Sequence, residues 1–308
     1  MKSLLFATLT CLSLLSCNKD NINTDNTPKP QIDFHQSAKT KYITVDNTKI
    51  AYRELGANTA TPLIMISALG GSMDDWDPAI TNALAQENKV ILFDLSGVGL
   101  SEGETPDNIE DMATQTISFI KALGYKKVNL LGFSMGSFIS QQILLQDKDL
   151  AEKIILTATG PKGSEGLSKL EELLASTAGL SAEETFLKFG FTSSETSQKI
   201  GKEVYKRIQL RQENRDLPLS QQSTIAELTA VLKWAQPAPE ALDELSHIEQ
   251  PVLIFQGEED VPVPVINARH LAEAIPNAQL NIYKDAGHSA AFQNAADFSK
   301  KANAFLKN

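Results

Sequence analysis

Short, nearly continuous runs of Val, Ile and Leu alternate along most of this chain with stretches whose apolar residues recur at helical spacing. The runs cover residues 62–68, 90–95, 128–133, 154–158, 252–256 and 280–283. Strands buried on both faces have this composition, because helices cover each face of a parallel sheet. Parallel neighbours also need crossover connections, which the helical stretches supply. We therefore expect an α/β fold with a mostly parallel central sheet flanked by helices.

Local signals place a hairpin and one helix within this pattern. The apolar runs 42–45 and 50–55 flank the turn Asp46-Asn47, as the strands of a hairpin do. Apolar residues then recur every three to five positions behind an Asp107-x-x-Glu110 capping box, at Ile109, Met112, Ile117, Ile120 and Leu123. This spacing predicts a helix over 109–123.

One long interval contains no predicted strand. Between about residues 161 and 246 only amphipathic patterns occur, at Leu167, Leu170 and Leu174, at Ile200, Val204 and Ile208, and at Ile225, Leu228 and Leu232. An insertion of that length is too long for a connecting loop. We expect an all-helical cap, inserted between two late strands of a domain that spans residues 40–308.

The N-terminal residues differ from the rest of the chain. Lys2 precedes an apolar stretch over 4–15, and Leu14-Leu15-Ser16-Cys17 follows it, so residues 1–16 are a predicted signal peptide. The last four of these residues resemble a bacterial lipobox, which implies a lipidated Cys17. Residues 17–39 are rich in Asn, Thr, Asp and Pro and are a predicted flexible tether. We expect an exported protein of the bacterial cell envelope that contacts the membrane only through this lipid.

Charge and cysteine content exclude several classes of protein. The net charge is −10, which opposes binding to nucleic acid phosphates. No apolar run is long enough to span a membrane. Cys11 and Cys17 are the only cysteines, so a processed chain would contain no disulfide and no cysteine metal site. The sequence leaves the oligomeric state open.

Gly132-Phe133-Ser134-Met135-Gly136 directly follows the predicted strand 128–133 and precedes a helix-compatible stretch over 135–146. A sharp turn between strand and helix exposes the serine hydroxyl above the sheet, and only small residues fit two positions to either side. An ordinary glycine-rich turn is the alternative. We predict that Ser134 is a nucleophile.

A serine nucleophile needs a histidine base and an acid that orients it. In this kind of site the acid and the histidine follow the serine in that order. Asp260 follows the strand 252–256, and His288 follows the strand 280–283, so both reach the same edge of the sheet as Ser134. Glu258 and Glu259 remain alternatives for the acid.

Acyl transfer also needs hydrogen-bond donors for the oxyanion. One is expected to be the backbone N–H of Met135, at the start of the helix after the nucleophile. The other is expected in the loop after the strand at 63–66, where Ser67-Ala68-Leu69-Gly70-Gly71-Ser72 is rich in small residues. We assign it to the N–H of Leu69.

These motifs together resemble the α/β-hydrolase family, in the branch that contains esterases, haloperoxidase-like enzymes and lactonases. The resemblance covers residues 41–308. Beside the serine turn it rests on four motifs in the family's order, which are Asp74-Asp75-Trp76, the loop from Phe93 to Ser101 (D-x-x-G-x-G-x-S), the acid loop at 257–262 and the histidine loop at 287–288. Ser67-Ala68 departs from the family's usual His-Gly pair.

The expected activity is hydrolysis of a carboxylic ester or related acyl bond in a small molecule. Lactone, thioester or carbon–carbon bond hydrolysis, perhydrolysis, and a non-catalytic binding protein are the alternatives. No cofactor and no metal is implied. Trp76, Phe133 and Trp234 are candidates for the substrate pocket, with core packing as the alternative role for each.

Overall fold

The structure is a computed structural model that describes residues 32–56 and 58–308. The predicted signal peptide and the predicted lipidation site, Cys17, lie outside the described residues and stay predictions. Residues 33–308 form one structural unit. No helix in the described part of the chain is long and apolar enough to cross a bilayer.

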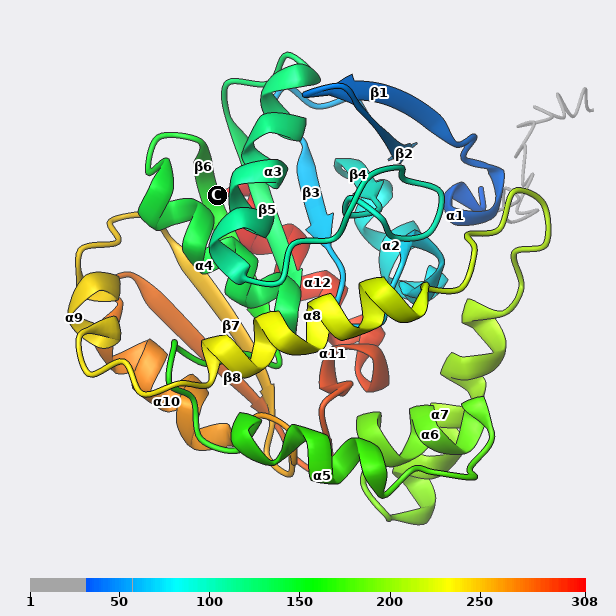
Figure 1. Cartoon of the computed structure of the whole chain (residues 1–308), viewed down its shortest axis with the longest axis vertical. Coiled ribbons are helices and arrows are strands. Elements are labelled where there is room, and N and C mark those ends of the chain that lie inside the picture. The colour runs from blue at the N-terminus through cyan, green and yellow to red at the C-terminus, as the bar shows by residue number, and fades with distance from the viewer. Residues whose placement is uncertain (1–31, 57) are drawn as a thin grey trace, which may run out of the picture. The chain divides into compact units, whose positions relative to one another are not determined.

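Within the described residues, eight strands form one sheet in the order β1-β2-β4-β3-β5-β6-β7-β8 (Figure 1). Their bounds are β1 Lys41–Val45, β2 Thr48–Gly56, β3 Leu63–Ile66, β4 Lys89–Phe93, β5 Val128–Phe133, β6 Ala151–Thr157, β7 Val252–Gly257 and β8 Ala278–Tyr283. β2 pairs antiparallel with β1 and with β4, and the remaining pairs are parallel. The predicted hairpin and the predicted mostly parallel sheet are confirmed.

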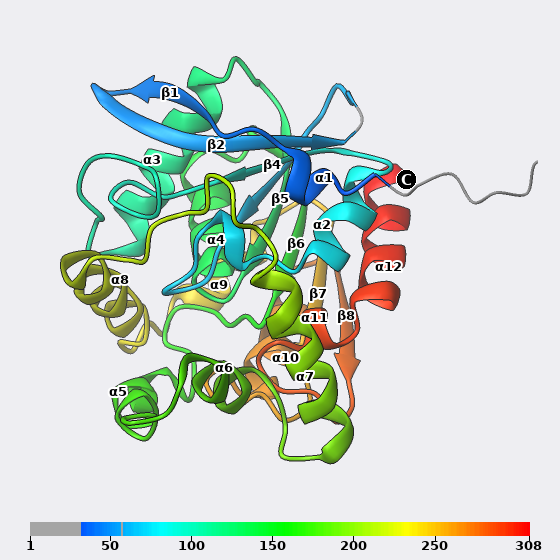
Figure 2. The ribbon, with the colours of Figure 1, turned by 90° about the vertical axis from the view of Figure 1, so that its right-hand side faces the viewer.

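Helices cover both faces of this sheet (Figure 2). One face packs against α2 (Pro78–Ala85) and α12 (Ala295–Lys307), and the other against α3 (Ile109–Ala122), α4 (Met135–Gln146) and α10 (Val265–Ala274). Along β3, Ile64 and Ile66 face one hydrophobic cluster, and Leu63 and Met65 face the other. Because successive side chains of a strand point to opposite faces, each face needs its own apolar residues, which explains the uninterrupted apolar runs.

Helix α3 lies where its spacing predicts, but the predicted capping box is wrong by one residue. Asn108 is the N-cap, and its side-chain oxygen accepts the N–H of Asp111 at 2.8 Å. Asn satisfies a free N–H of the first turn as well as Asp does, and the sequence offers both at adjacent positions.

The interval between β6 and β7 is helical in the structure, as predicted. It contains a short 3-10 turn, η2 (Leu167–Lys169), and the helices α5 (Leu170–Ala175), α6 (Ala182–Gly190), α7 (Glu195–Ile208), α8 (Gln221–Trp234) and α9 (Ala241–Ser246). The carbonyl of Gly190 accepts the N–H of Ser289 at 2.8 Å, so the cap reaches the loop that follows β8. Helix α9 packs against α4 and α10 and belongs to the body of the domain.

A buried ionic cluster joins the cap to the sheet. Arg53 of β2 lies 2.5 Å from Asp74 and 2.9 Å from Asp216, and the three side chains are almost completely buried. Asp74 lies in η1 (Met73–Asp75) after β3, and Asp216 lies between α7 and α8. Because a buried guanidinium requires its partners, this cluster fixes the cap segment beside the loop after β3.

Residues 33–39, which the sequence places in the tether, pack against the domain. They form α1 (Phe34–Ser37) and an adjoining segment, and His35 is only 2% exposed. The ring of His35 lies 2.9 Å from the Thr81 hydroxyl, and Arg211 donates hydrogen bonds to the carbonyls of His35 and Ala38. These partners come from distant parts of the chain, so local composition does not reveal them.

Candidate active site

Ser134 occupies a strained turn between β5 and α4. Its φ of 53° lies in the left-handed region that non-glycine residues rarely adopt. A Cβ at Gly136 would collide with the backbone of Ile66, and a Cβ at Gly132 would collide with the backbone of Gly136. The two glycines therefore allow the close packing that holds the serine at the end of the strand.

The side chains of Ser134, His288 and Asp260 form a continuous hydrogen-bonded chain. His288 Nε2 lies 2.8 Å from Ser134 Oγ, and Nδ1 lies 2.9 Å and 3.0 Å from the two carboxylate oxygens of Asp260. A neutral imidazole that donates its Nδ1 proton to Asp260 accepts the serine hydroxyl at Nε2. The three residues predicted from the sequence thus meet at one edge of the sheet, with the geometry that a serine nucleophile requires.

The acid is held by two further donors. The N–H of Val263 donates to Asp260 Oδ1 at 2.9 Å, and Gln256 Nε2 donates to Oδ2 at 2.8 Å. Glu258 and Glu259, the alternatives left open by the sequence, are exposed and make no contact with the imidazole among the described residues. Asp285 accepts hydrogen bonds from the hydroxyls of Thr192 and Ser194, so it holds the loop after β8 against the cap.

The two backbone amides predicted for the oxyanion, those of Leu69 and Met135, have no hydrogen-bond partner among the described residues. The segment 67–72, which we call the oxyanion loop, is held by a turn in which the N–H of Gly71 donates to the carbonyl of Ala68 at 3.0 Å. Ser67, which replaces the histidine usual in the resembling family, donates its hydroxyl to the carbonyl of Ser72 at 3.1 Å.

The loop after β4 supports the oxyanion loop. Asp94 Oδ1 accepts the N–H of Met73 at 2.9 Å, and Oδ2 accepts the N–H of Leu100 at 3.0 Å. Burial raises the pKa of the Asp94 carboxyl well above its usual value. Asp94 therefore holds the loop after β3 and the loop after β4 together.

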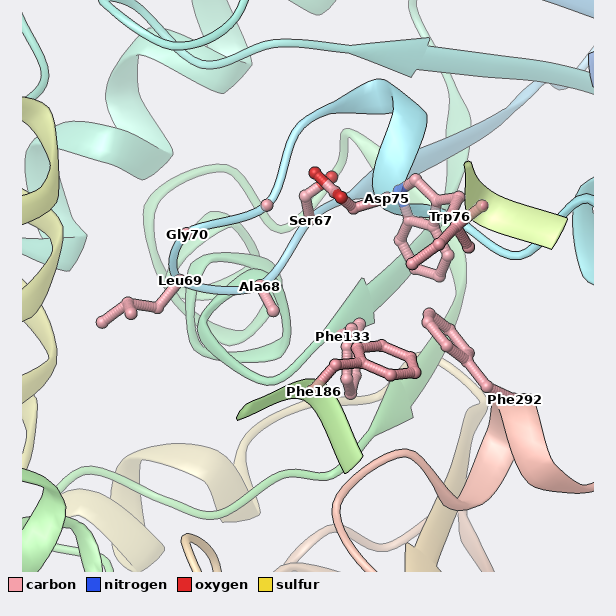
Figure 3. Close-up of a pocket in the computed structure, with 11 residues that line it drawn as sticks. Ser67, Ala68, Leu69, Gly70, Asp75, Trp76, Phe133, Phe186 and Phe292 are labelled. Carbon is pink, nitrogen blue, oxygen red and sulfur yellow. The ribbon is translucent and has the colours of Figure 1, made fainter. Parts of the chain in front are cut away.

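A cavity of about 180 Å³ adjoins the oxyanion loop (Figure 3). Its remaining walls come from Asp75, Trp76, Phe133, Phe186, Ile208 and Phe292. Ser134 and His288 are not among these walls, but Phe133 directly precedes Ser134, and the centroid of its ring lies 5.5 Å from that of His288, so one wall of the cavity adjoins the triad. The aromatic side chains make it a mainly apolar space of the kind that binds small ligands.

Two of the three pocket candidates from the sequence, Trp76 and Phe133, line this cavity. The third, Trp234, does not. Its ring stacks on Phe138 with the centroids 5.4 Å apart and is buried in the cluster beneath α3 and α4. Trp234 lies at the end of α8 that is anchored to the body of the domain, so its ring lies outside this cavity.

A sequence profile described as alpha/beta hydrolase fold matches residues 61–295. The chain belongs to the α/β-hydrolase family. This match confirms the predicted family and fold, and the narrower branch suggested by the motifs stays a prediction.

Individual α/β-hydrolase relatives cover most of the chain. A poly(3-hydroxyalkanoate) depolymerase from Ectopseudomonas oleovorans is 29% identical over 231 residues, which are 74% of this chain and 78% of the relative. A putative carbamate hydrolase from Stutzerimonas stutzeri is 24% identical over 250 residues, 78% of this chain and 89% of the relative. An α/β-hydrolase fold protein from Chitinophaga pinensis has a solved structure with a TM-score of 0.86 and 37% identity, covering 88% of this chain and 98% of that chain. These relatives support a hydrolase activity.

Sequence reasoning assigned no site role to three polar residues of this α/β-hydrolase site. Gln256 orients the acid, and Asp75 lines the cavity. Glu227 of α8 is completely buried, accepts the N–H of Gly70 at 2.7 Å through Oε2, and has no partner for Oε1 among the described residues. Burial raises the pKa of Glu227 to about 7. In the sequence, Gln256 stands out as a polar residue at the end of an apolar strand. No sequence pattern distinguishes Glu227.

Proposed function

We propose that this chain is a serine hydrolase that cleaves a carboxylic ester or related acyl bond through an acyl-enzyme intermediate. The observation that carries the proposal is the hydrogen-bonded chain from Ser134 Oγ through His288 to Asp260, at 2.8 Å and 2.9 Å. A serine hydroxyl at the end of such a chain can lose its proton to the imidazole as it attacks.

In the first half of the proposed reaction, Ser134 Oγ attacks the acyl carbon and His288 Nε2 accepts the hydroxyl proton. His288 then donates this proton to the leaving alcohol, and Asp260 stabilises the imidazolium that forms in between. The free N–H groups of Leu69 and Met135 would stabilise the negative oxygen of the tetrahedral intermediate. In the second half, water loses a proton to His288, attacks the acyl-enzyme and releases Ser134 with its proton restored.

Turnover of a matched substrate panel tests this proposal. Purified protein is given esters, lactones and thioesters of the same short acids, with Ser134→Ala as the matched control. We expect hydrolysis by the wild type of at least one class, and a loss of about 10³-fold or more in the variant. Turnover of lactones or thioesters alone would keep the serine mechanism and change the proposed substrate class. Ligand binding without any turnover would favour a non-catalytic binding protein.

We further propose export and lipid attachment at Cys17, on the sequence pattern alone. Expression in a bacterium fed an alkyne-tagged fatty acid tests this, with Cys11→Ala as the control for Cys17→Ala. We expect the tag in the wild type and in the Cys11 variant but not in the Cys17 variant. A tagged Cys17→Ala variant would contradict the lipidation site.

A further inference from the structure

Asp75 brings a carboxylate to the cavity beside the oxyanion loop. It is the only charged side chain among the walls of that cavity, which otherwise consist of the oxyanion loop and apolar side chains (Figure 3). Its Oδ2 accepts the N–H of Ser72 at 2.8 Å and the hydroxyl of Ser72 at 3.0 Å. Its Oδ1 accepts no hydrogen bond from any described residue and is free for a ligand.

The surroundings leave this oxygen without a compensating partner. Burial raises the pKa of the Asp75 carboxyl, while the positive charge of Arg215 lowers it. Arg215 directs its hydrogen bonds elsewhere, to the carbonyls of Ile208 and Arg211 and to the side chain of Gln209, and forms no ion pair with Asp75. Asp75 is half-buried and lines the cavity, and Oδ1 has no donor among the described residues, so a donor on a bound substrate can form a charge-assisted hydrogen bond with it.

The size of the cavity limits what can carry that donor. A volume of about 180 Å³ lies below the roughly 300–1,000 Å³ of most ligand pockets. Trp76, Phe133, Phe186 and Phe292 provide apolar walls for the carbon atoms of such a group. The space therefore suits a short chain with one polar substituent better than a long fatty chain.

We propose that the substrate bears a hydroxyl or a protonated amine on a short chain that enters this cavity, where the donor binds Oδ1 of Asp75. The inference rests on the proposed function, because it names the substrate class of the same site. In this proposal Asp75 determines which substrates bind. It holds the substrate and takes no part in bond cleavage.

Matched esters test the proposed donor. On the acyl side, ethyl 3-hydroxybutanoate, 3-aminobutanoate and 3-methylbutanoate differ only in a hydroxyl, an ammonium or a methyl group. On the alcohol side, 2-hydroxyethyl butanoate is compared with propyl butanoate. We expect at least one donor-bearing ester to exceed its methyl counterpart in kcat/KM by about 10- to 100-fold, the range for a hydrogen bond to a charged group. The arm that shows the preference identifies the donor and the side of the ester that enters the cavity.

The variant Asp75→Asn links the preference to this carboxylate. It keeps an oxygen that can accept the Ser72 N–H but loses the charge. The kcat/KM of a donor-bearing ester, divided by that of its methyl counterpart, is therefore expected to fall to within about threefold of one. The matched control Glu213→Gln removes an exposed carboxylate from the neighbouring cap segment and should keep the wild-type ratio.

The outcomes separate this inference from the proposed function. Hydrolysis of all esters without a donor preference in either arm would overturn the inference and leave the proposed function standing. A preference that persists in Asp75→Asn would also overturn it. If that variant does not fold, the wild-type ratios decide alone. Absence of any turnover, with no labelling of Ser134 by a fluorophosphonate, would overturn both.

Discussion

Glu227 leads to a prediction of how the folding stability of this hydrolase changes with pH. Its side chain is completely buried, and burial raises its pKa from 4.5 to about 7. Since one pKa unit corresponds to about 1.4 kcal/mol, this shift amounts to about 3 kcal/mol. The pKa is raised in the folded state, so this stability is fully present below pH 4.5 and is lost as the pH rises through about 7.

The variant Glu227→Gln isolates this contribution. Glutamine is neutral at every pH and keeps an oxygen that can accept the N–H of Gly70. The free energy of unfolding of the variant, minus that of the wild type, is therefore expected to increase by about 2.5 kcal/mol between pH 5 and pH 8. Urea unfolding followed by circular dichroism at several pH values between these limits measures this difference directly.

Comparison at each pH is necessary because other buried groups titrate in the same range. Asp216, for example, has its pKa raised to about 6, mainly by burial. The control Glu244→Gln lies at an exposed position on α9 and is expected to change the stability by less than about 0.5 kcal/mol. If the stabilities of the wild type and Glu227→Gln run parallel from pH 5 to pH 8, the assignment of a raised pKa to this carboxyl is refuted.

Three further predictions follow from buried groups and close contacts. Arg53→Met leaves two buried carboxylates without their partner and is expected to cost about 3–5 kcal/mol in urea unfolding, so unchanged stability would contradict the ionic cluster. Gly136→Ala forces a Cβ into the backbone of β3 and should cost about 1–3 kcal/mol and lower kcat, which normal turnover at normal stability would disprove. Asp260→Asn should lower kcat about 10³- to 10⁴-fold, whereas Glu258→Gln and Glu259→Gln should stay within about threefold of the wild type; the reverse pattern would move the acid to one of the glutamates.

The sheet was predictable because its signal is local. Each parallel strand carries a run of apolar residues for both faces, and the helices between them carry their own spacing. The predicted order of Ser134, Asp260 and His288 at strand ends was enough to bring them to one edge, since carboxyl ends of parallel strands meet there. The structure places these three side chains within hydrogen-bonding distance.

The cap was predictable as helical but not in its contacts. The apolar spacing of Ile225, Leu228 and Leu232 suggests that they form the buried face of α8, yet Ile225 is 57% exposed. The buried face instead carries Glu227 and Trp234, with Ser223, Ala230 and Val231. Its contacts are set by loops distant in the sequence, such as the Gly70 N–H, so no local pattern identifies them.

The central claim is that Ser134 is an activated nucleophile. Reaction of the purified protein with a fluorophosphonate, followed by intact-mass measurement and peptide mapping, tests it most directly. We predict one phosphonyl group per chain, attached to Ser134, and slow or no labelling in His288→Ala, because that variant lacks the base. Labelling at another residue, or no labelling of a folded wild-type protein, would contradict the account.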